Sequence, residues 1–477
     1  MKHTDIIQKL NLEQKCALLS GETVFTTRAL PGKGIPAITL SDGPNGVRKQ
    51  AGAADHLGLN PSVPATCFPT SSATACSWDE KLGEAVGEAL GEEAAAQEVA
   101  VLLGPGLNIQ RSPLCGRDFE YFSEDPILAG RMAAAYVRGI QKNGISACPK
   151  HFAVNSQELR RMASDSVLDE RTLRELYLTG FEIVVKEAKP KTIMTSYNLI
   201  NGTYANENAH LLQDILRKDW GFDGAVVTDW GGSNDHALGV KNGSTLEMPC
   251  PGGDSIRELM KAVRDGKISE ADVDARLDEM LELVLSTHAA VEKAPRTFDA
   301  AAHHKLARRA AAESIVLLRN EGGILPLKPN EKLAVIGDFA ETPRYQGAGS
   351  SAVNALQVDT LLDSIKADDS GITLVGYASG FERQGAADAE KLEEAVALAK
   401  KADTVLLCLG LDELRESEGL DRSDMKLAEN QQQLLAAVAA VNPNVVVLLS
   451  AGAPIETPWA GQCRALVYGA LGGQAGA

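Results

Sequence analysis

Short apolar runs rich in β-branched residues alternate with longer segments of helical hydrophobic spacing between residues 35 and 249. Six of these runs are typical of strands: 38–44, 99–109, 145–152, 192–198, 224–230 and 245–249. Strands separated by helices predict a parallel sheet. Because barrels of this class occupy about 250 residues, the pattern predicts an α/β fold with an amino-terminal (β/α)8 barrel of the TIM type.

A second α/β pattern follows a charged helical stretch at 268–293 and a polar, Pro-containing segment at 292–305. Its predicted strands are 332–338, 372–378, 403–410, 444–452 and 464–470. We therefore expect a barrel at 1–290, a linker at 291–312 and an α/β sandwich domain at 313–477. The sequence ends where a strand should lead into a covering helix, so we expect this second domain to be truncated at its C-terminal end.

The charge of the chain narrows the classes of partner. The 477 residues carry a formal net charge of -17, which disfavours nucleic acid and anionic membrane surfaces because phosphate binding needs clustered Lys and Arg. The first residues lack the continuous apolar core of an export signal. Eight cysteines are scattered without metal-ligand spacing. We expect a cytoplasmic enzyme with reduced thiols, no metal and no organic cofactor.

Polar side chains stand at the carboxyl ends of several predicted strands. They are Asp42, Lys150, His151, Tyr197 and Asp229. An Asp after a strand often only starts a turn or caps a helix. Chemistry in α/β barrels gathers at this end of the strands, however, so the clustering favours a site. Asp229, in the run GAVVTDW, is the candidate nucleophile.

If Asp229 is a nucleophile, it needs a second carboxyl group, on the other side of the scissile bond, to protonate the leaving group. The acid-rich segment 412–427 of the second domain offers Glu418, with Glu416 and Glu413 as rivals. Such segments are more often solvated surface. The segment alone therefore leaves the assignment open.

Two further motifs have both a structural and a functional interpretation. In SDGPNGVR, Asp42 either caps a turn or accepts hydrogen bonds from the hydroxyl groups of a sugar, with Arg48 at the same strand end. In GRDFEYFSEDP, Arg117 either neutralises an acid in the site or joins two loops. The Gly-rich segment 345–353 lacks the spacing of a nucleotide loop.

Taken together, these motifs resemble glycoside hydrolase family 3, and most closely its bacterial β-glucosidases. The resemblance runs through most of the chain in the family's order: SDGPNGVR, GRDFEYFSEDP, ACPKHFAVNSQELRRM, IMTSYN, GAVVTDW, IVLLRNEGGILPL, YQGAGSS and ESEGLDR. It implies a TIM-type barrel followed by an α/β sandwich that lends a loop to the active site. KHFAVNSQE replaces the histidine-bearing loop of the N-acetylglucosaminidase branch, which disfavours that branch.

The resemblance also implies residue roles. Asp229 matches the nucleophile and Glu418 the acid/base, while Trp230 matches an aromatic wall of the pocket. The positions that match residues holding the sugar are Asp42, Arg48, Arg117, Lys150, His151, Arg161 and Tyr197. Cations near Asp42 and Asp229 are expected to keep both ionised. Glu418 is expected to hold its proton more tightly than an ordinary carboxyl group.

The implied activity is that of a retaining, exo-acting β-glucosidase that releases glucose from the non-reducing end of β-glucosides. The expected partner is a small β-glycoside or oligosaccharide, with a homo-oligomer or a missing C-terminal segment as further options. A β-xylosidase, an α-arabinofuranosidase, a glycoside phosphorylase and a non-catalytic sugar-binding protein remain alternatives, because one hydroxymethyl group is a small energetic difference.

Overall fold

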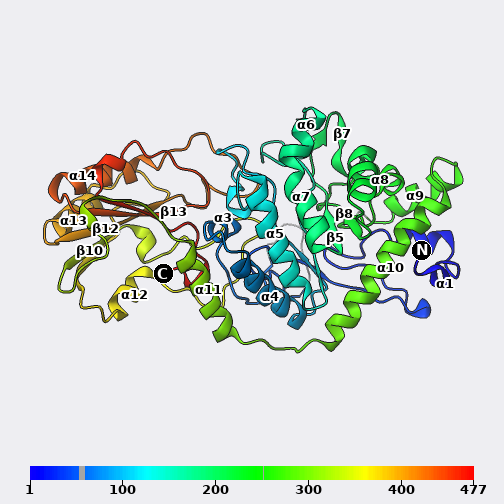
Figure 1. Ribbon diagram of the computed structural model, residues 1–477, viewed down its shortest axis with the longest axis horizontal. Helices are drawn as coiled ribbons and strands as arrows, with labels where there is room; N and C mark the ends of the chain where they lie inside the picture. Colours follow the sequence, from blue (N-terminus) through cyan, green and yellow to red (C-terminus); the bar gives the residue numbers. More distant parts are fainter. Residues whose placement is uncertain (53–59, 251) are drawn as a thin grey trace.

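Two separate hydrophobic cores organise the chain in the computed structural model, which describes residues 1–52, 60–250 and 252–477 (Figure 1). The first core collects apolar side chains from residues 7–310, joined by Val353 and Ala475. The second collects those from residues 333–466. This arrangement confirms the prediction of two α/β domains. The limits of those domains stay a prediction.

The first domain holds five short parallel strands in two sheets. One sheet has the order β1 (Leu40–Asp42), β2 (Val101–Leu103), β3 (Ser146–Ala147), and the other pairs β5 (Thr192–Met194) with β8 (Ala225–Val227). Pro105 and Pro149 follow β2 and β3 closely and lack the N–H that a longer ladder needs. A closed eight-stranded barrel is therefore not confirmed by the strand pairing.

Isolated parallel bridges extend the order of these strands. Phe152 pairs with Thr195 between the two sheets, and Leu246 pairs with Val227. The predicted strand at 245–249 is thus reduced to single bridges. A third small sheet contains β4 (Asp165–Ser166), β6 (Leu199–Ile200) and β7 (Thr203–Tyr204).

Helices flank these strands, and several begin at acidic caps. The α-helices of the first domain are α1 (Thr4–Ile7), α2 (Leu12–Ala17), α3 (Ser71–Ala75), α4 (Glu80–Ala96), α5 (Pro126–Gln141), α6 (Glu170–Thr172), α7 (Thr179–Ile183), α8 (His236–Asn242), α9 (Asp254–Arg264) and α10 (Glu270–Lys293). Turns of π-helix occur at η3 (Leu173–Tyr177), η4 (Val184–Ala188) and η6 (His210–Asp219). Asp79 and Asp125 accept backbone N–H groups at the starts of α4 and α5. No helix in the described ranges is both long and apolar enough to cross a bilayer.

The second domain is built on a six-stranded sheet with the order β11-β10-β12-β13-β14-β9. Its strands are β9 (Val316–Asn320), β10 (Lys332–Ile336), β11 (Thr373–Ala378), β12 (Thr404–Gly410), β13 (Val445–Ser450) and β14 (Ala465–Tyr468). All five predicted strands are confirmed. They are parallel and largely buried, which explains their nearly continuous apolar runs. β9, which was not predicted, is antiparallel to β14.

Four helices belong to this half of the chain: α11 (Ala300–Ser314), α12 (Leu361–Ala367), α13 (Ala389–Ala399) and α14 (Glu429–Val441). α11 lies mostly within the segment predicted as a linker, 291–312, and it packs against α3 and α4 of the first domain. Residues 294–299 connect α10 to α11 along one side of the molecule (Figure 1). The segment predicted as a linker is therefore largely helical.

The two domains also meet through backbone contacts. Ala65 forms a parallel bridge with Ala355, and the side chain of Gln474 accepts the N–H of Cys67. Residues 411–428, named here the acid loop, join the carboxyl end of β12 to α14. This placement lets the second domain reach the carboxyl ends of the parallel strands of the first domain.

Helices α4 and α5 approach closely enough to require glycine. A Cβ atom on Gly87 would lie 2.4 Å from the carbonyl oxygen of Tyr136, and one on Gly139 would lie 2.2 Å from that of Glu84. The two backbones therefore pack with no side chain between them at these positions.

We expect Gly87→Ala to destabilise the protein, although alanine is ordinarily the better helix former. Because the new methyl group meets backbone rather than a flexible side chain, the free energy of unfolding should fall by about 1–3 kcal/mol. Urea unfolding followed by circular dichroism measures this change. In the control Gly83→Ala the methyl group meets the mobile end of Met132 at 3.2 Å, so the effect should be smaller. Equal stability of Gly87→Ala and the parent would contradict the close approach.

Candidate active site

Parallel strands deliver the first group of predicted residues to one edge of the first domain. Asp42 ends β1, Lys150 follows β3, and Asp229 follows β8. Burial alone would lower the pKa of Lys150, but carboxylates around it, Glu120 first and then Asp42 and Asp229, raise it. Lys150 is therefore a buried cation that connects the predicted carboxylates electrostatically.

Asp229 is a buried carboxylate with one hydrogen-bonded oxygen. Only 8% of the residue is exposed, and Oδ1 accepts the N–H of Trp230 at 2.7 Å. Oδ2 has no hydrogen-bond partner among the described residues, and it lies 3.7 Å from Nε2 of His151. This oxygen is thus buried, with its hydrogen-bonding capacity unused by the described residues.

Burial raises the pKa of two carboxyl groups that we expected the nearby cations to keep ionised. The pKa of Asp229 is raised although Arg117, Arg161 and Lys150 oppose the effect. The pKa of Asp42 rises to about 6, again because burial outweighs Lys150. The prediction underestimated the cost of removing these charges from water.

His151 is a neutral imidazole in this environment. Burial, followed by the charges of Arg117 and Lys150, holds its pKa well below the usual range. Its Nδ1 lies 3.2 Å from the hydroxyl group of Tyr121. The ring therefore adds hydrogen-bonding capacity beside Asp229 without adding charge.

The acid loop brings Glu418 to the barrel domain. Oε1 accepts a hydrogen bond from Nη1 of Arg161 at 2.8 Å and lies 3.5 Å from Nη1 of Arg117. Oε2 accepts the N–H of Ser350 at 2.8 Å. The guanidinium groups of Arg117 and Arg161 in the first domain thus hold the carboxylate of Glu418 in the second domain.

The pKa of Glu418 moves opposite to our expectation. Burial would raise it, but the charges of Arg117 and Arg161 and the hydrogen bonds from Ser350 together lower it well below the usual range. Glu418 is therefore an ionised partner of two arginines. No spacing in the sequence predicts this particular pairing.

The rival acids of the same loop have other surroundings. Glu416 is fully buried, accepts the N–H of Gly452 at 2.8 Å and faces Arg344. Glu413 pairs with Arg344 and Arg383 of the sandwich domain. Neither contacts a barrel residue through these bonds, so the geometry favours Glu418 of the three.

Glu120 is a buried acid that we did not predict as part of the site. It is 0% exposed, and its carboxylate lies 2.5 Å from Nε of Arg117 and 3.1 Å from Nζ of Lys150. The motif GRDFEYF contained the signal, because an acid three residues after Arg117 on a short helical turn faces it. Glu120 therefore compensates both cations that border the site.

Aromatic side chains line the other side of the cluster. The hydroxyl group of Tyr197 donates to the carbonyl oxygen of Trp230 at 2.9 Å, and the guanidinium of Arg161 lies 4.9 Å from the centre of the Tyr197 ring. The Trp230 ring packs on Phe25 at 5.3 Å, and its Nε1 donates to the carbonyl oxygen of Val24. These contacts fix both rings beside Asp229.

Arg48 reaches the sandwich side of the cluster. Its Nη1 donates to the carbonyl oxygen of Gly349 at 3.2 Å, next to Ser350, which bonds Glu418. A cavity of about 440 Å³ opens between Arg48 and Phe25. Every predicted site residue therefore lies in, or directly beside, one network of contacts.

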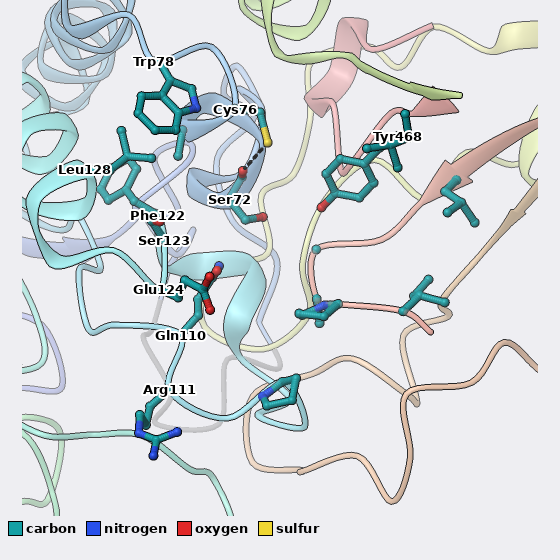
Figure 2. Close-up of a pocket in the computed structure, with 18 of the residues that line it drawn as sticks. Ser72, Cys76, Trp78, Gln110, Arg111, Phe122, Ser123, Glu124, Leu128 and Tyr468 are labelled. Carbon is teal, nitrogen blue, oxygen red and sulfur yellow. Dashed lines mark hydrogen bonds between the residues drawn. The ribbon is translucent and has the colours of Figure 1, made fainter. Parts of the chain in front are cut away.

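Another cavity, of about 650 Å³, lies at the junction of the two domains and is lined by residues such as Trp78, Arg111 and Tyr468 (Figure 2). None of the predicted site residues lines it. Within the described part of the chain, no group of three or more His, Cys, Asp or Glu side chains is arranged to hold a metal ion.

We expect the contribution of Glu418 to stability to depend on pH. Because its folded-state pKa is lowered, its contribution is present above the unfolded-state pKa of about 4.3 and is lost as the pH falls toward the folded-state value. Glu418→Gln should therefore melt about 2–4 °C below the parent at pH 7, and this gap should shrink below about pH 4.3. Thermal unfolding of both proteins between pH 7 and pH 3.5 measures the gap. A gap that stays constant or widens on acidification would contradict the ion pairs.

Comparison with known proteins gives the family. The N-terminal domain of glycosyl hydrolase family 3 matches residues 48–283, and the family's C-terminal domain matches residues 315–477. Thermostable beta-glucosidase B of Acetivibrio thermocellus is 46% identical over 98% of this chain and 62% of its own length. An exo-alpha-(1->6)-L-arabinopyranosidase of Bifidobacterium longum is 44% identical over 98% of this chain and 63% of its own length. The chain thus spans less than two thirds of these two relatives.

A solved structure agrees with the sequence relatives. Beta-glucosidase 3B of Thermotoga neapolitana in complex with alpha-D-glucose superposes with a TM-score of 0.90 and 32% sequence identity, over 100% of this chain and 73% of that chain. Both domains therefore have counterparts in a sugar-binding enzyme. On these matches, the chain belongs to glycoside hydrolase family 3.

Proposed function

We propose that this chain is a retaining, exo-acting β-glycosidase, and specifically a β-glucosidase, whose nucleophile is Asp229 and whose acid/base is Glu418. The observation that carries the proposal is the pair of carboxyl groups from different domains that share cations. Arg117 and Arg161 influence the pKa of both groups. Such a pair is the minimum that acid-assisted glycoside cleavage requires.

The reaction would proceed in two steps. The unpartnered oxygen of Asp229 attacks the anomeric carbon while Glu418 donates a proton to the departing oxygen, which gives a glycosyl ester. Glu418 then removes a proton from water, and that water releases the sugar with its β configuration retained. Direct attack requires the two carboxyl groups to lie about 5–5.5 Å apart.

Glu418 has to lose part of its ion pairing before it can act as an acid. Its carboxylate holds Arg161 at 2.8 Å, and this charge opposes protonation. We propose that a sugar in the site takes over hydrogen bonds from Arg161 and so weakens this pair. The pKa of Glu418 would then rise toward the range in which it exchanges protons near neutral pH.

The remaining residues of the network would hold the sugar. Charged groups suited to sugar hydroxyls are Asp42, Arg48, Arg117, Lys150 and Arg161, with His151 and Tyr197 as neutral partners and Trp230 as an apolar wall. Hydrogen bonds from buried, already paired groups orient a polyol strongly, since they need little rearrangement.

We also propose an incomplete, irregular TIM-type barrel at 1–290, a connecting segment at 291–312 and the sandwich domain at 313–477. The parallel order of β1, β2, β3, β5 and β8, continued by bridges at Leu246 and Glu247, supports the barrel. The catalytic groups would then stand at the ends of its strands, as in other barrels.

The glycone is the least constrained part of the proposal. One relative bears the name thermostable beta-glucosidase B, and another, at similar identity, bears the name exo-alpha-(1->6)-L-arabinopyranosidase. A pentose lacks the hydroxymethyl group of glucose, and one such group changes binding by only about 1–3 kcal/mol. Arabinopyranoside cleavage is therefore our second candidate activity.

We expect Asp229→Ala and Asp229→Asn to lose at least about 10³-fold in kcat, because the covalent intermediate can no longer form. Azide should restore turnover to Asp229→Ala and give the α-glycosyl azide, which identifies the missing nucleophile. Hydrolysis of 4-nitrophenyl β-glucoside and NMR of the azide product measure both effects. Asp223→Asn, an exposed acid before the same strand, is the matched control and should keep parental activity. Substantial activity in either Asp229 variant would end the assignment.

A panel of 4-nitrophenyl glycosides should separate the candidate substrates. We expect β-glucoside to give the highest kcat/KM, with α-L-arabinopyranoside second and no dependence on added phosphate. Acceleration by phosphate, with release of a sugar phosphate, would instead indicate a phosphorylase. Tight glucose binding without hydrolysis of any glycoside would identify a sugar-binding protein and overturn the proposal.

A further inference from the structure

Asp421 stands three residues after Glu418 in the acid loop, and its carboxylate contacts the barrel domain. Oδ1 accepts the N–H groups of Gly116 at 3.2 Å and Glu158 at 3.0 Å. Oδ2 accepts those of Glu158 at 3.1 Å and Leu159 at 2.8 Å. One side chain of the sandwich therefore joins two separate barrel loops.

Glu158 of the barrel domain makes a similar contact with the acid loop. Oε2 of Glu158 accepts the N–H of Gly419 at 2.8 Å, and it also accepts a hydrogen bond from Arg161 at 2.7 Å. The backbone of Arg422 donates to the carbonyl oxygen of Leu114 at 2.7 Å. Hydrogen bonds to the barrel thus follow Glu418 directly along the loop, at Gly419, Asp421 and Arg422.

The fit between the loops leaves no space for a side chain at Gly116. A Cβ atom at this position would lie 1.7 Å from the carbonyl oxygen of Leu420 and 2.6 Å from that of Ser417. Both atoms are backbone and cannot turn aside. The acid loop is therefore seated directly against the barrel.

Asp421 itself is poorly placed to transfer protons. Both of its oxygens accept backbone N–H groups, and these hydrogen bonds occupy the directions that a substrate would need. A carboxylate that accepts several backbone donors forms strong, directional contacts. Its suitable role is to hold two backbones together.

We propose that Asp421 is a positioning residue for the acid/base step: by tethering the acid loop to the loops at 116 and 158–159, it sets where Glu418 stands relative to Asp229. This inference rests on the proposed function of Glu418. A misplacement of about 1 Å in a reacting group can cost about 100-fold in rate. The tether should therefore matter most where proton donation is rate-limiting.

Leaving-group dependence tests the proposal. Asp421→Asn keeps the size of the side chain but places an NH₂ group against backbone N–H groups. We expect its kcat/KM for cellobiose or methyl β-glucoside to fall about 100-fold. Its kcat/KM for 2,4-dinitrophenyl β-glucoside should change little, because that leaving group departs without a proton. A merely structural defect would lower all of these values equally.

Azide gives a second signature in the same variant. Because Glu418 also activates water for the second step, kcat for the activated substrate should fall and azide should restore it, with β-glycosyl azide as the product. The matched control is Asp424→Asn, since the hydrogen bonds of Asp424 to described residues go to Ser423 and Lys426 of its own loop. It should behave as the parent does on every substrate.

Glu418→Gln separates the failure of this inference from the failure of the proposed function. If Glu418→Gln shows the leaving-group dependence and Asp421→Asn loses activity uniformly or not at all, the positioning role is wrong. If Glu418→Gln shows no dependence, the acid/base assignment fails instead.

Hydrogen exchange provides a readout that needs no activity. In the intact 477-residue chain, the amides of Gly116, Glu158 and Leu159 should exchange faster in Asp421→Asn than in Asp424→Asn or the parent. Unchanged exchange would overturn the tether whatever the kinetics show. Should Asp421→Asn unfold below the assay temperature, Gly116→Ala disturbs the same contact from the barrel side and should give the same selective loss.

Discussion

The pairing of Glu418 with Arg117 and Arg161 is the interaction on which the site depends, because it joins a carboxylate of one domain to cations of the other. Burying such charges is costly unless each has a partner. Arg117 is 2% exposed and is shared between Glu120 and Glu418. The ion pairs of Glu418 with Arg117 and Arg161 form only when the two domains are docked, so the site and the docking of the domains stabilise each other.

Burial and charge act against each other differently at each carboxyl group. At Asp42 and Asp229 burial prevails and the pKa is raised, whereas at Glu418 two guanidinium groups and a backbone donor prevail and the pKa is lowered. These opposite pKa shifts follow from the number of direct hydrogen bonds that each carboxylate accepts. Among the described residues, Glu418 accepts direct hydrogen bonds from Arg161 and Ser350, while the carboxylate of Asp229 accepts one, from the N–H of Trp230.

The sequence predicts those parts of the protein that local pattern controls. Apolar runs that end in a polar residue singled out Asp42, Lys150, Tyr197 and Asp229 as candidates, and the five predicted strands of the second domain were correct. It could not distinguish Glu418 from Glu416 by spacing, since only the folded chain shows which one meets the barrel. Glu120, Glu158 and Asp421 were missed for the same reason. Their partners include residues brought near only by folding, and burial, which sets the pKa values, has no local signature.

The reciprocal contacts of Glu158 and Asp421 have an evolutionary consequence. Glu418 and Asp421 are three positions apart, and one fixes the direction in which the other points. Insertions or deletions between them should be rejected, whereas an exposed position of the same loop, such as Leu414, is under no such constraint. Sequence divergence in this loop among homologues should therefore concentrate at such exposed positions while this four-residue spacing is inherited intact.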